Sequence, residues 1–249
     1  MKNKRLSNRF DPQGLTLIEL LVTMAITSML LVALAALVSQ STDAYSLSQR
    51  SLDHISQSRA FFQIFQSELS LRLPDTPIIH QTSIKGDPIN SDRIIFVRTL
   101  PTNEQSVNSR GDIAASCYYV AFVEDVNQRV VPKLFRKILN SKETQNMIEA
   151  GSSAEFPEVD PTLDEPILDF VLSFQAIPMF LDPTTGSAEP WDNAIHYVPS
   201  HVRLTIRTID ESFSGRYINE AEWNRLTISP KENERQMIRT SSCNLSIGK

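Results

Sequence analysis

The sequence has few glycines and no excess of basic residues, and both shortages exclude classes of protein. Seven glycines in 249 residues are too few for an enzyme that holds phosphates in several glycine-rich loops. Lysine and arginine number 24 against 29 aspartates and glutamates, a net charge of −5. No basic surplus is therefore available to neutralise a nucleic-acid backbone, and we expect no nucleic-acid partner. The 41% hydrophobic content is ample for a folded core.

Catalytic motifs are also lacking. Neither Gly-x-Ser-x-Gly nor His-Glu-x-x-His occurs in the sequence. His196 and His201 have no nearby cysteine or third histidine, so they provide too few ligands for a tight metal site. The pair Asp210-Glu211 follows an apolar run and indicates a solvated turn rather than a general base. We therefore expect no catalytic residue, no metal and no cofactor, and we predict that the protein is not an enzyme.

Helix breakers are missing from a long stretch near the amino terminus. The 59 residues between Gly14 and Pro74 contain neither glycine nor proline, and they would extend about 88 Å as one helix. Within them, residues 15–38 carry a single charge, Glu19. At 1.5 Å per residue this segment reaches about 36 Å, enough to cross a hydrocarbon core of roughly 30 Å. The sequence therefore predicts one long helix whose first half spans a membrane.

The charges around the predicted span indicate its orientation. Residues 1–14 carry Lys2, Lys4, Arg5 and Arg9 against Asp11, and such a positive flank stays in the cytoplasm. Residues after 38 are then exported. A cleaved signal peptide is an alternative, although its apolar stretch has 7 to 15 residues and ends in a small-x-small site. A plain signal anchor fits the length and flanks equally well, and the intramembrane carboxylate of Glu19 argues against it because such groups mark functional contacts.

The residues around Glu19 form a recognisable motif. The string Gly14-Leu15-Thr16-Leu17-Ile18-Glu19-Leu20 follows directly on the basic leader. It resembles the signal of type IV prepilins and of type II secretion pseudopilins, although Leu15 stands where that family more often has phenylalanine. The resemblance implies that a prepilin peptidase cuts after Gly14 and methylates the new amino terminus at Leu15. It also implies that Glu19 is the family's fifth-position glutamate, which serves filament assembly.

The assembly role of Glu19 has a physical reason. Cleavage creates an α-amino group about four residues, or roughly 6 Å along a helix, from the Glu19 carboxylate. An unpaired carboxylate in apolar surroundings is costly, so pairing with the amino terminus of a neighbouring subunit is favourable and sets the axial register. A glutamate tolerated near the interface without any partner is the alternative.

The second half of the predicted helix, residues 39–73, is amphipathic. Its large apolar residues recur at helical spacing on one stripe, which should face a globular domain. A coiled-coil dimer is the alternative, and Phe61 beside Phe62 argues against a regular seam. The stripe consists of Tyr45, Leu52, Ile55, Phe62, Phe65 and Leu69.

Residues 74–249 show short apolar runs separated by Pro, Asp, Asn and Ser, the texture of a β-rich domain. Short helices are expected at 141–150 and 219–226, and an exposed acidic loop, with a metal site as a weak alternative, at 151–166. The fold class is therefore α+β and pilin-like, with the long helix packed on an antiparallel sheet. Strands are predicted at 93–98, 117–123, 130–139, 167–177 and 202–209.

Two cysteines, Cys117 and Cys243, lie in the exported part. On the oxidising side of the membrane they can pair as a disulfide that ties the carboxyl end to the sheet. Two buried free thiols are the alternative, and the sequence does not decide between them because it gives no separation of the two Cα atoms.

The size of the exported part indicates a subtype. Major pilins and pseudopilins are shorter, and the chain is most similar to a large minor pseudopilin of the J type. Residues 191–206, a tryptophan followed by Val198-Pro199 and a strand, are loosely similar to the late part of such subunits. A prepilin-like family from Verrucomicrobial gene cassettes is an equally good match. Minor subunits of this kind are thought to sit at the filament tip.

These observations predict an inner-membrane, single-pass subunit that assembles into a periplasmic pseudopilus for protein secretion. The expected partners are the prepilin peptidase, other pseudopilin subunits and the inner membrane, together with exported cargo or the secretin. A minor pilin of a type IV pilus or of a DNA-uptake filament is the first alternative. A signal-anchored periplasmic enzyme or binding protein, unrelated to filaments, is the second.

Overall fold

The structure is a computed structural model that describes residues 16–82, 88, 90–100, 112–151, 155–182, 184–191 and 199–247. Its helices and strands form an α+β fold. The chain divides into two compact units, residues 1–51 and 52–249.

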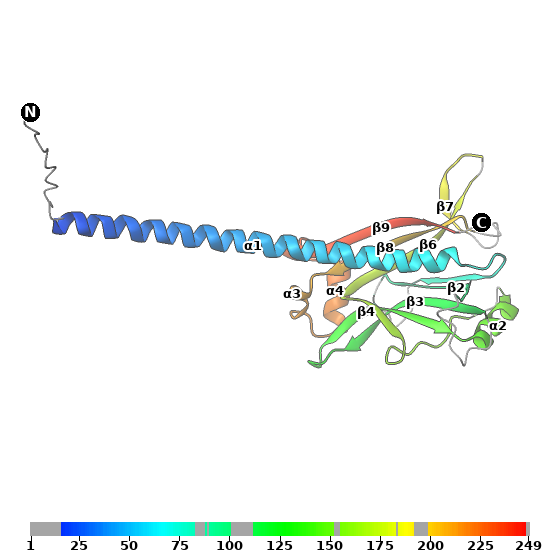
Figure 1. Cartoon of the computed structure of the whole chain (residues 1–249). Coiled ribbons are helices and arrows are strands. Elements are labelled where there is room, and N and C mark those ends of the chain that lie inside the picture. Colours follow the sequence, from blue (N-terminus) through cyan, green and yellow to red (C-terminus); the bar gives the residue numbers. More distant parts are fainter. Residues whose placement is uncertain are drawn as a thin grey trace, which may run out of the picture. The chain divides into compact units, whose positions relative to one another are not determined.

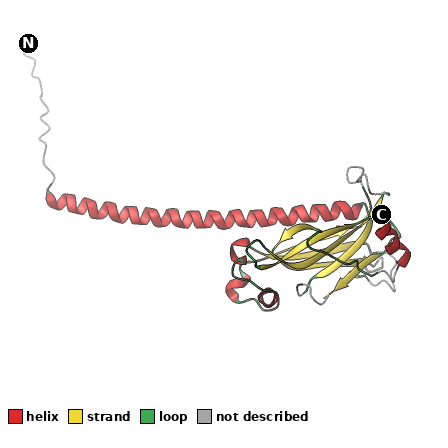
Figure 2. Ribbon diagram, turned by 90° about the horizontal axis from the view of Figure 1, so that it is seen from below, coloured by secondary structure: helices red, strands yellow, loops and turns green. Residues whose placement is uncertain are grey.

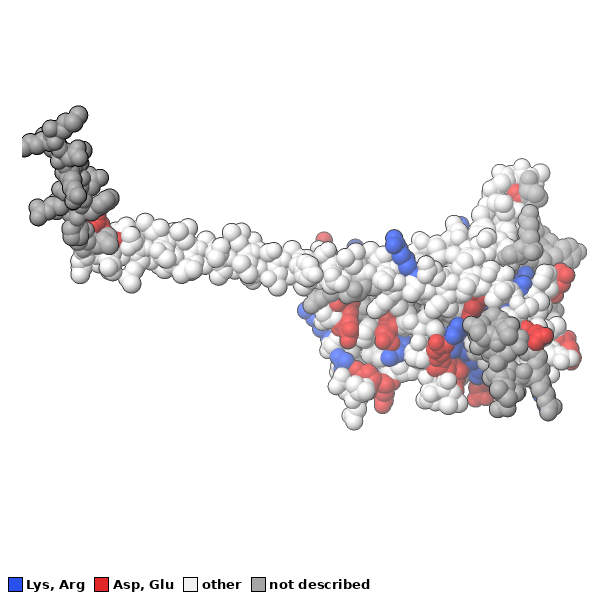
Figure 3. All heavy atoms as spheres, in the orientation of Figure 1, with Lys and Arg blue, Asp and Glu red and all other residues white. Residues whose placement is uncertain are grey.

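Helix α1 runs from Leu17 to Ser70, 54 residues without interruption, which confirms the long helix expected from the absence of breakers. Its stretch Leu17–Ser46 is the one helix among the described residues that is long and apolar enough to cross a membrane. No charged residue occurs between Glu19 and Asp43, and Figure 3 accordingly shows this stretch as an almost uncoloured surface. The sequence-based prediction of a membrane-length helix is confirmed.

The second unit contains two antiparallel sheets (Figure 1). The first has five strands in the order β1-β2-β3-β4-β5, and the second has four in the order β7-β6-β8-β9. Strands that follow one another in sequence pair throughout the first sheet, which is therefore an antiparallel meander. The bounds are β1 Ile78–Thr82, β2 Asp92–Thr99, β3 Ile113–Glu124, β4 Val130–Leu139, β5 Glu165–Asp169, β6 Val171–Leu181, β7 Ala188–Pro190, β8 His201–Ile209 and β9 Ile238–Ser246.

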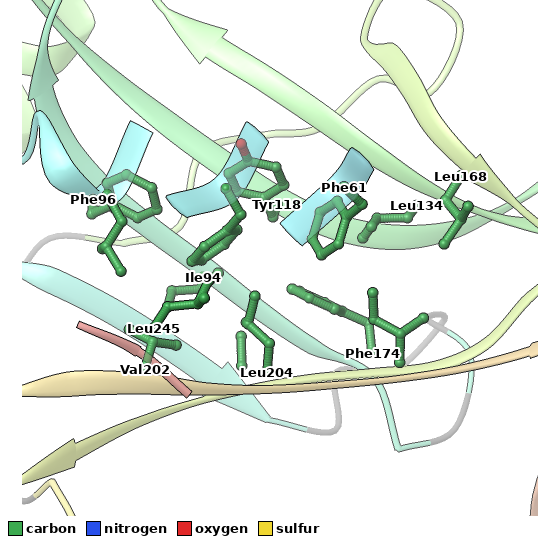
Figure 4. Close-up of a cluster of buried hydrophobic side chains, with 14 of the residues drawn as sticks. Phe61, Ile94, Phe96, Tyr118, Leu134, Leu168, Phe174, Val202, Leu204 and Leu245 are labelled. Carbon is green, nitrogen blue, oxygen red and sulfur yellow. The ribbon is translucent and has the colours of Figure 1, made fainter. Parts of the chain in front are cut away.

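The main core lies where the last turns of α1 meet both sheets. Phe61 contacts Tyr118 of the first sheet and Phe174 of the second in edge-to-face geometry, at ring-centroid distances of 5.9 and 6.1 Å, an arrangement that aromatic pairs favour. Figure 4 shows the labelled side chains of the two sheets pointing into one shared interior. Burial of these large apolar groups is the main force that holds the helix end on the sheets.

Short helices lie at the two ends of the sheets (Figure 2). Helix α2, Ser141–Ala150, begins with a capping box between Asn140 and Glu143 and places Met147 over the outer face of the first sheet. At the other end, Trp223 of α4 packs into a second small cluster and donates a hydrogen bond to the Val130 carbonyl at 2.6 Å. The helices of that end are α3 Glu211–Ser214, α4 Glu220–Ile228 and α5 Glu232–Arg235.

One predicted strand is wrong. The apolar run 167–177 was expected to form a single strand, but it breaks at Phe170, whose φ of 57° lies in the left-handed region. Strand β5 ends before this residue in the first sheet, and β6 begins after it in the second. A continuous apolar run is compatible with either outcome because both strands are partly buried. Phe170 is therefore the point where the chain passes from one sheet to the other.

The predicted apolar stripe of α1 is correct only at its end. Phe65 and Leu69 are fully buried, but Phe62 is half-buried and the inward position next to it belongs to Phe61. The buried face passes through Ser58, Phe61, Phe65 and Leu69, which keeps the helical period of three to four residues. The three earlier members of the stripe, Tyr45, Leu52 and Ile55, are exposed in the chain.

Both cysteines are free thiols in the structure. Cys117 is buried on the outer face of the first sheet, among residues that pack beneath α2. Cys243 lies in β9 of the second sheet and packs against the main core. The disulfide is therefore not formed here, because successive strand residues point to opposite faces and Cys117 faces away from the core that Cys243 touches. Burial raises the pKa of the Cys117 thiol well above its usual value and that of Cys243 to about 11.

Glu234 joins α5 to α4. Its carboxylate accepts hydrogen bonds from the Arg225 guanidinium at 2.7 and 3.1 Å and from the Lys231 backbone N–H at 2.7 Å. The Arg225 guanidinium, more than any other group, lowers the pKa of Glu234 to about 2. A carboxylate with a lowered folded-state pKa contributes stability above its unfolded pKa, and this stability is lost as pH falls toward the folded value.

We therefore expect unfolding free energy to fall between about pH 5 and pH 2 more steeply in the wild type than in Glu234→Gln. Arg225 is 40% exposed, so solvent screens the pair, and the expected difference at pH 7 is about 1 kcal/mol or less. Denaturant unfolding of both full-length proteins in detergent, at a series of pH values, measures it. Parallel pH profiles for the two proteins would contradict the assignment.

Candidate assembly site on α1

The first turn of α1 contains a capping box made by Thr16 and Glu19. The backbone N–H and the hydroxyl of Thr16 both donate to Oε2 of Glu19, each at 2.9 Å. The backbone N–H of Glu19 donates to the Thr16 hydroxyl oxygen at 3.4 Å. This reciprocal arrangement, Thr-x-x-Glu, satisfies N–H groups that the start of a helix leaves without a partner. Glu19 is therefore held in place by its own helix.

The capping box uses one carboxylate oxygen. Both hydrogen bonds that the Glu19 carboxylate accepts from Thr16 go to Oε2, so within the described residues Oε1 remains able to accept a hydrogen bond from another molecule. Residues 16–45 are exposed along the whole stretch. None of the described residues of this unit shields the carboxylate, and a cationic donor that reaches the start of the helix can pair with it.

The two residues of the predicted cleavage site, Gly14 and Leu15, lie outside the described residues, so cleavage and methylation remain predictions. Thr16 is the second residue after the predicted cut. Removal of residues 1–14 would therefore leave both members of the capping box in the mature chain.

A buried ion network anchors the other end of α1 to the first sheet. Oε1 of Glu68 lies 3.1 Å from Nη2 of Arg98 and 2.7 Å from Nη1 of Arg136. Oε2 accepts a hydrogen bond from the Tyr118 hydroxyl at 2.5 Å. The side chains of Glu68 and Arg98 are 5% and 0% exposed, so the charges of this pair are removed from water. Such a pair stabilises the fold only while both partners are present.

The network continues to the surface. Arg98 donates from Nε to the Ser116 hydroxyl at 2.8 Å, and Arg136 forms an ion pair with Glu165 of β5, which is 55% exposed. Burial, and next the Glu68 carboxylate, raise the pKa of Tyr118 well above its usual value, so Tyr118 stays a hydrogen-bond donor. The network fixes the rotation of the α1 end on the sheet because Glu68 must face both arginines.

The other residues considered from the sequence have structural contacts. Nδ1 of His201 lies 2.9 Å from the Ser200 hydroxyl, and His196 lies outside the described residues. Asp210 caps α3 by accepting from the Ser212 N–H at 2.9 Å. In the acidic segment, Asp164 accepts from the Tyr119 hydroxyl at 2.6 Å. Across the described parts of the chain, no three His, Cys, Asp or Glu side chains are placed to hold a metal ion.

Two parts of this site were not predicted from the sequence. The capping box could have been predicted, since Thr-x-x-Glu before an apolar run is its signature. The Glu68 network could not have been predicted, because Arg98 and Arg136 follow 30 and 68 positions after Glu68 and no local pattern connects them.

Comparison with known proteins identifies the amino-terminal segment. Residues 10–35 match the family described as prokaryotic N-terminal methylation motif, which covers about a tenth of the chain and includes Thr16 and Glu19. No curated protein and no solved structure gives a significant match. The motif, together with the membrane-length helix and the α+β domain, supports a type IV pilin-like protein with a prepilin-type amino terminus.

Proposed function

We propose that this protein is a minor pseudopilin, a structural subunit at or near the tip of a periplasmic pseudopilus involved in protein secretion. The methylation motif implies processing by a prepilin peptidase and assembly with other pilin-like subunits. The family to which this motif belongs is one of structural subunits. The protein would then act by packing and recognition rather than by catalysis.

The observation that carries the proposal is the Thr16–Glu19 capping box at the start of a membrane-length helix, inside the matched motif. The box fixes the Glu19 carboxylate and leaves Oε1 for a donor from outside the chain. A charged group at membrane depth is costly and is retained when it has a partner. The processed amino terminus of a neighbouring subunit is the cation that such a filament supplies.

The size of the exported domain supports a position at the tip. Strands and helices from Ile78 to Ser246 enclose a main core and two smaller clusters, a larger domain than a repeating filament subunit needs. A tip subunit has no subunit above it, so a bulky domain meets no obstacle there. Its surfaces would contact other tip subunits, exported cargo or the secretin.

Amino-terminal mapping of the natural protein tests the proposal. We expect mass spectrometry of protein purified from membranes to find a chain that begins at N-methylated Leu15, because the peptidase cuts after Gly14. A Gly14→Leu variant, which fills the position before the cut, should keep Met1 and serves as the control. A wild-type chain that retains Met1, or begins elsewhere, would favour the signal-anchored alternative.

A further inference from the structure

Strand β9, drawn in red in Figure 1, is an edge strand of the second sheet and pairs on one side with β8. The Ile247 N–H donates to the Ser200 carbonyl at 3.1 Å. In an antiparallel ladder, residues alternate between those that bond to the partner strand and those that do not. Every second residue of β9 therefore directs its backbone N–H and C=O away from β8. These residues are Ile238, Thr240, Ser242, Asn244 and Ser246.

The outer side of β9 is open along its middle. Thr240, Ser242 and Asn244 are exposed, and their outward backbone groups have no partner among the described residues. At the end of the strand, the Gln66 side chain donates to the Ser246 carbonyl at 3.3 Å, which confirms that this carbonyl points outward. A row of free N–H and C=O groups is a template for an added strand.

The other margins of the two sheets are short or blocked. Strands β1, β5 and β7 have five, five and three residues, and β5 and β7 each contain a proline. Beyond β7, the Ala176 N–H of β6 donates to Asp92 at 3.0 Å. The Leu172 carbonyl of β6 accepts from the Thr227 hydroxyl at 3.2 Å. Such features prevent unwanted strand pairing at an edge.

Strand β9 has none of this protection. It has nine residues, an unbroken register with β8, no proline and one charged residue, Arg239. Proteins usually protect a long, regular edge because it invites pairing with other chains. An edge left open where the other margins are short or blocked indicates a surface for interaction.

The outer face of the sheet beside this edge is basic. Arg203 and Arg207 of β8 share a face with Asn244 and Thr240 of β9, because directly paired residues of neighbouring strands point to the same side. Arg203 is exposed. No aspartate or glutamate occurs in β6, β8 or β9. An added strand would lie about 9.5 Å from β8, twice the strand spacing, and Arg203 can reach a carboxylate on such a strand.

A second copy of this chain fits the edge less well than an acidic strand does. Pairing of two β9 strands would join the two outer faces and place two copies of Arg203 and of Arg207 on one surface. The paired strands would bring no carboxylate to offset these charges, and like charges on one face oppose association. The edge therefore favours a different partner, one that carries aspartate or glutamate.

The chemistry of the edge suits a partner that binds and then leaves. The exposed side chains along it, Thr240, Ser242 and Asn244, are polar and small, so an added strand would bury little apolar surface. Permanent interfaces between subunits are more hydrophobic. A contact made mainly by main-chain hydrogen bonds and charge is better suited to cargo in transit than to a subunit that stays in the filament.

We propose that the outer edge of β9 binds an extended acidic segment of an exported protein as an added β-strand. This inference rests on the proposed function, since it names the surface by which a tip subunit would contact its cargo. Main-chain hydrogen bonds to Thr240, Ser242 and Asn244 supply the affinity, and Arg203 supplies the preference for carboxylates.

Peptide binding to the full-length protein in detergent tests the edge and its charge preference. The probes are dye-labelled ten-residue peptides of alternating threonine and glutamate, or of alternating threonine and lysine. We expect fluorescence anisotropy to show at least fivefold tighter binding of the glutamate peptide. Hydrogen exchange measured by mass spectrometry should slow in residues 238–246. Equal affinities, or exchange that is unchanged there, would overturn the proposal.

Variants of one edge residue test strand addition itself. Ser242→Pro removes an outward N–H and spares the hydrogen bonds to β8, because Ser242 does not bond to that strand. Its affinity for the glutamate peptide should fall at least tenfold, whereas Ser242→Ala should stay within twofold of the wild type. Equal binding by the proline and alanine variants would overturn strand addition.

Reversal of a charge gives a test that does not depend on the proline variant folding. Arg203 is exposed, so Arg203→Glu should leave the fold intact. The variant should bind the lysine peptide more tightly than the glutamate peptide, the opposite of the wild type. An unchanged preference would show that Arg203 does not select the partner.

Photocrosslinking in native cells identifies the source of the strand. A photoreactive amino acid is placed at Ser242, or at Glu189 of the short edge β7 as the control. We expect adducts with exported proteins at position 242, at least fivefold more than at position 189. Adducts at 242 with pilin-like subunits or with a second copy of this chain, or equal adducts at both positions, would overturn the assignment to cargo.

Failure of this inference can be told from failure of the proposed function. The mature amino terminus is mapped in the same cells. A chain that begins at Leu15 and enters filaments, but forms no cargo adduct at position 242, would overturn the β9 edge alone. A chain that retains Met1 and enters no filament would overturn the proposed function and the assignment to cargo with it.

Discussion

Replacement of Glu68 by alanine is expected to lower the free energy of unfolding by about 3–5 kcal/mol. The change leaves Arg98, which is fully buried, without the carboxylate 3.1 Å away, and breaking a buried pair by removing one partner has this cost. Alanine is the best helix former, so a loss of helix propensity cannot explain the effect. Denaturant unfolding of the full-length protein in detergent, followed by fluorescence of the buried Trp223, measures it.

The matched control is Glu165→Ala. Glu165 belongs to the same network but is 55% exposed, and an exposed ion pair contributes about 1 kcal/mol or less. Both substitutions remove one negative charge from the same network, but Glu68 is buried and Glu165 is exposed. Equal losses from both, or a loss below about 1 kcal/mol from Glu68→Ala, would show that the network does not anchor the helix.

The regular parts of the fold could be predicted because their signals are local. The lack of breakers gave the extent of α1, and the alternation of Val202, Leu204 and Ile206 with polar residues gave a half-buried strand. Helix α2 was predicted with its bounds. In each case the period of the apolar residues agrees with the burial that the fold imposes.

The parts that were missed depend on contacts between distant segments. Strand β9 was not predicted because its residues are mostly polar, with Leu245 as its one buried residue, and it is held by pairing with β8. The break at Phe170 is a property of the two-sheet arrangement rather than of the run that contains it. The choice between Phe61 and Phe62 depended on the rotation of α1, which the Glu68 network fixes.

One part of the candidate site can be predicted from the local sequence, and the other part cannot. The first turn of α1 is readable from seven consecutive residues because capping, membrane insertion and processing act on a continuous segment. The anchor at Glu68 needs two arginines from the sheet, so it is visible only in three dimensions. Together they place a capped carboxylate in the first turn of α1 and a buried ion network at its last turns.

The Glu19→Leu and Glu19→Ala variants are expected to enter filaments at least tenfold less than the wild type. Either change leaves a neighbour's amino terminus unpaired in the membrane, and loss of one partner of a buried pair costs several kcal/mol, while 1.4 kcal/mol already corresponds to a factor of ten. Quantitative immunoblots of the filament and membrane fractions measure incorporation. The membrane level and the removal of the leader should stay normal.

Glu19→Gln separates the two roles of this residue. A glutamine side-chain oxygen can still accept from Thr16 and complete the capping box, but it carries no charge for a neighbouring ammonium. If charge pairing drives assembly, Glu19→Gln should fail as severely as Glu19→Leu. If the variant assembles like the wild type, Glu19 acts as a helix cap alone.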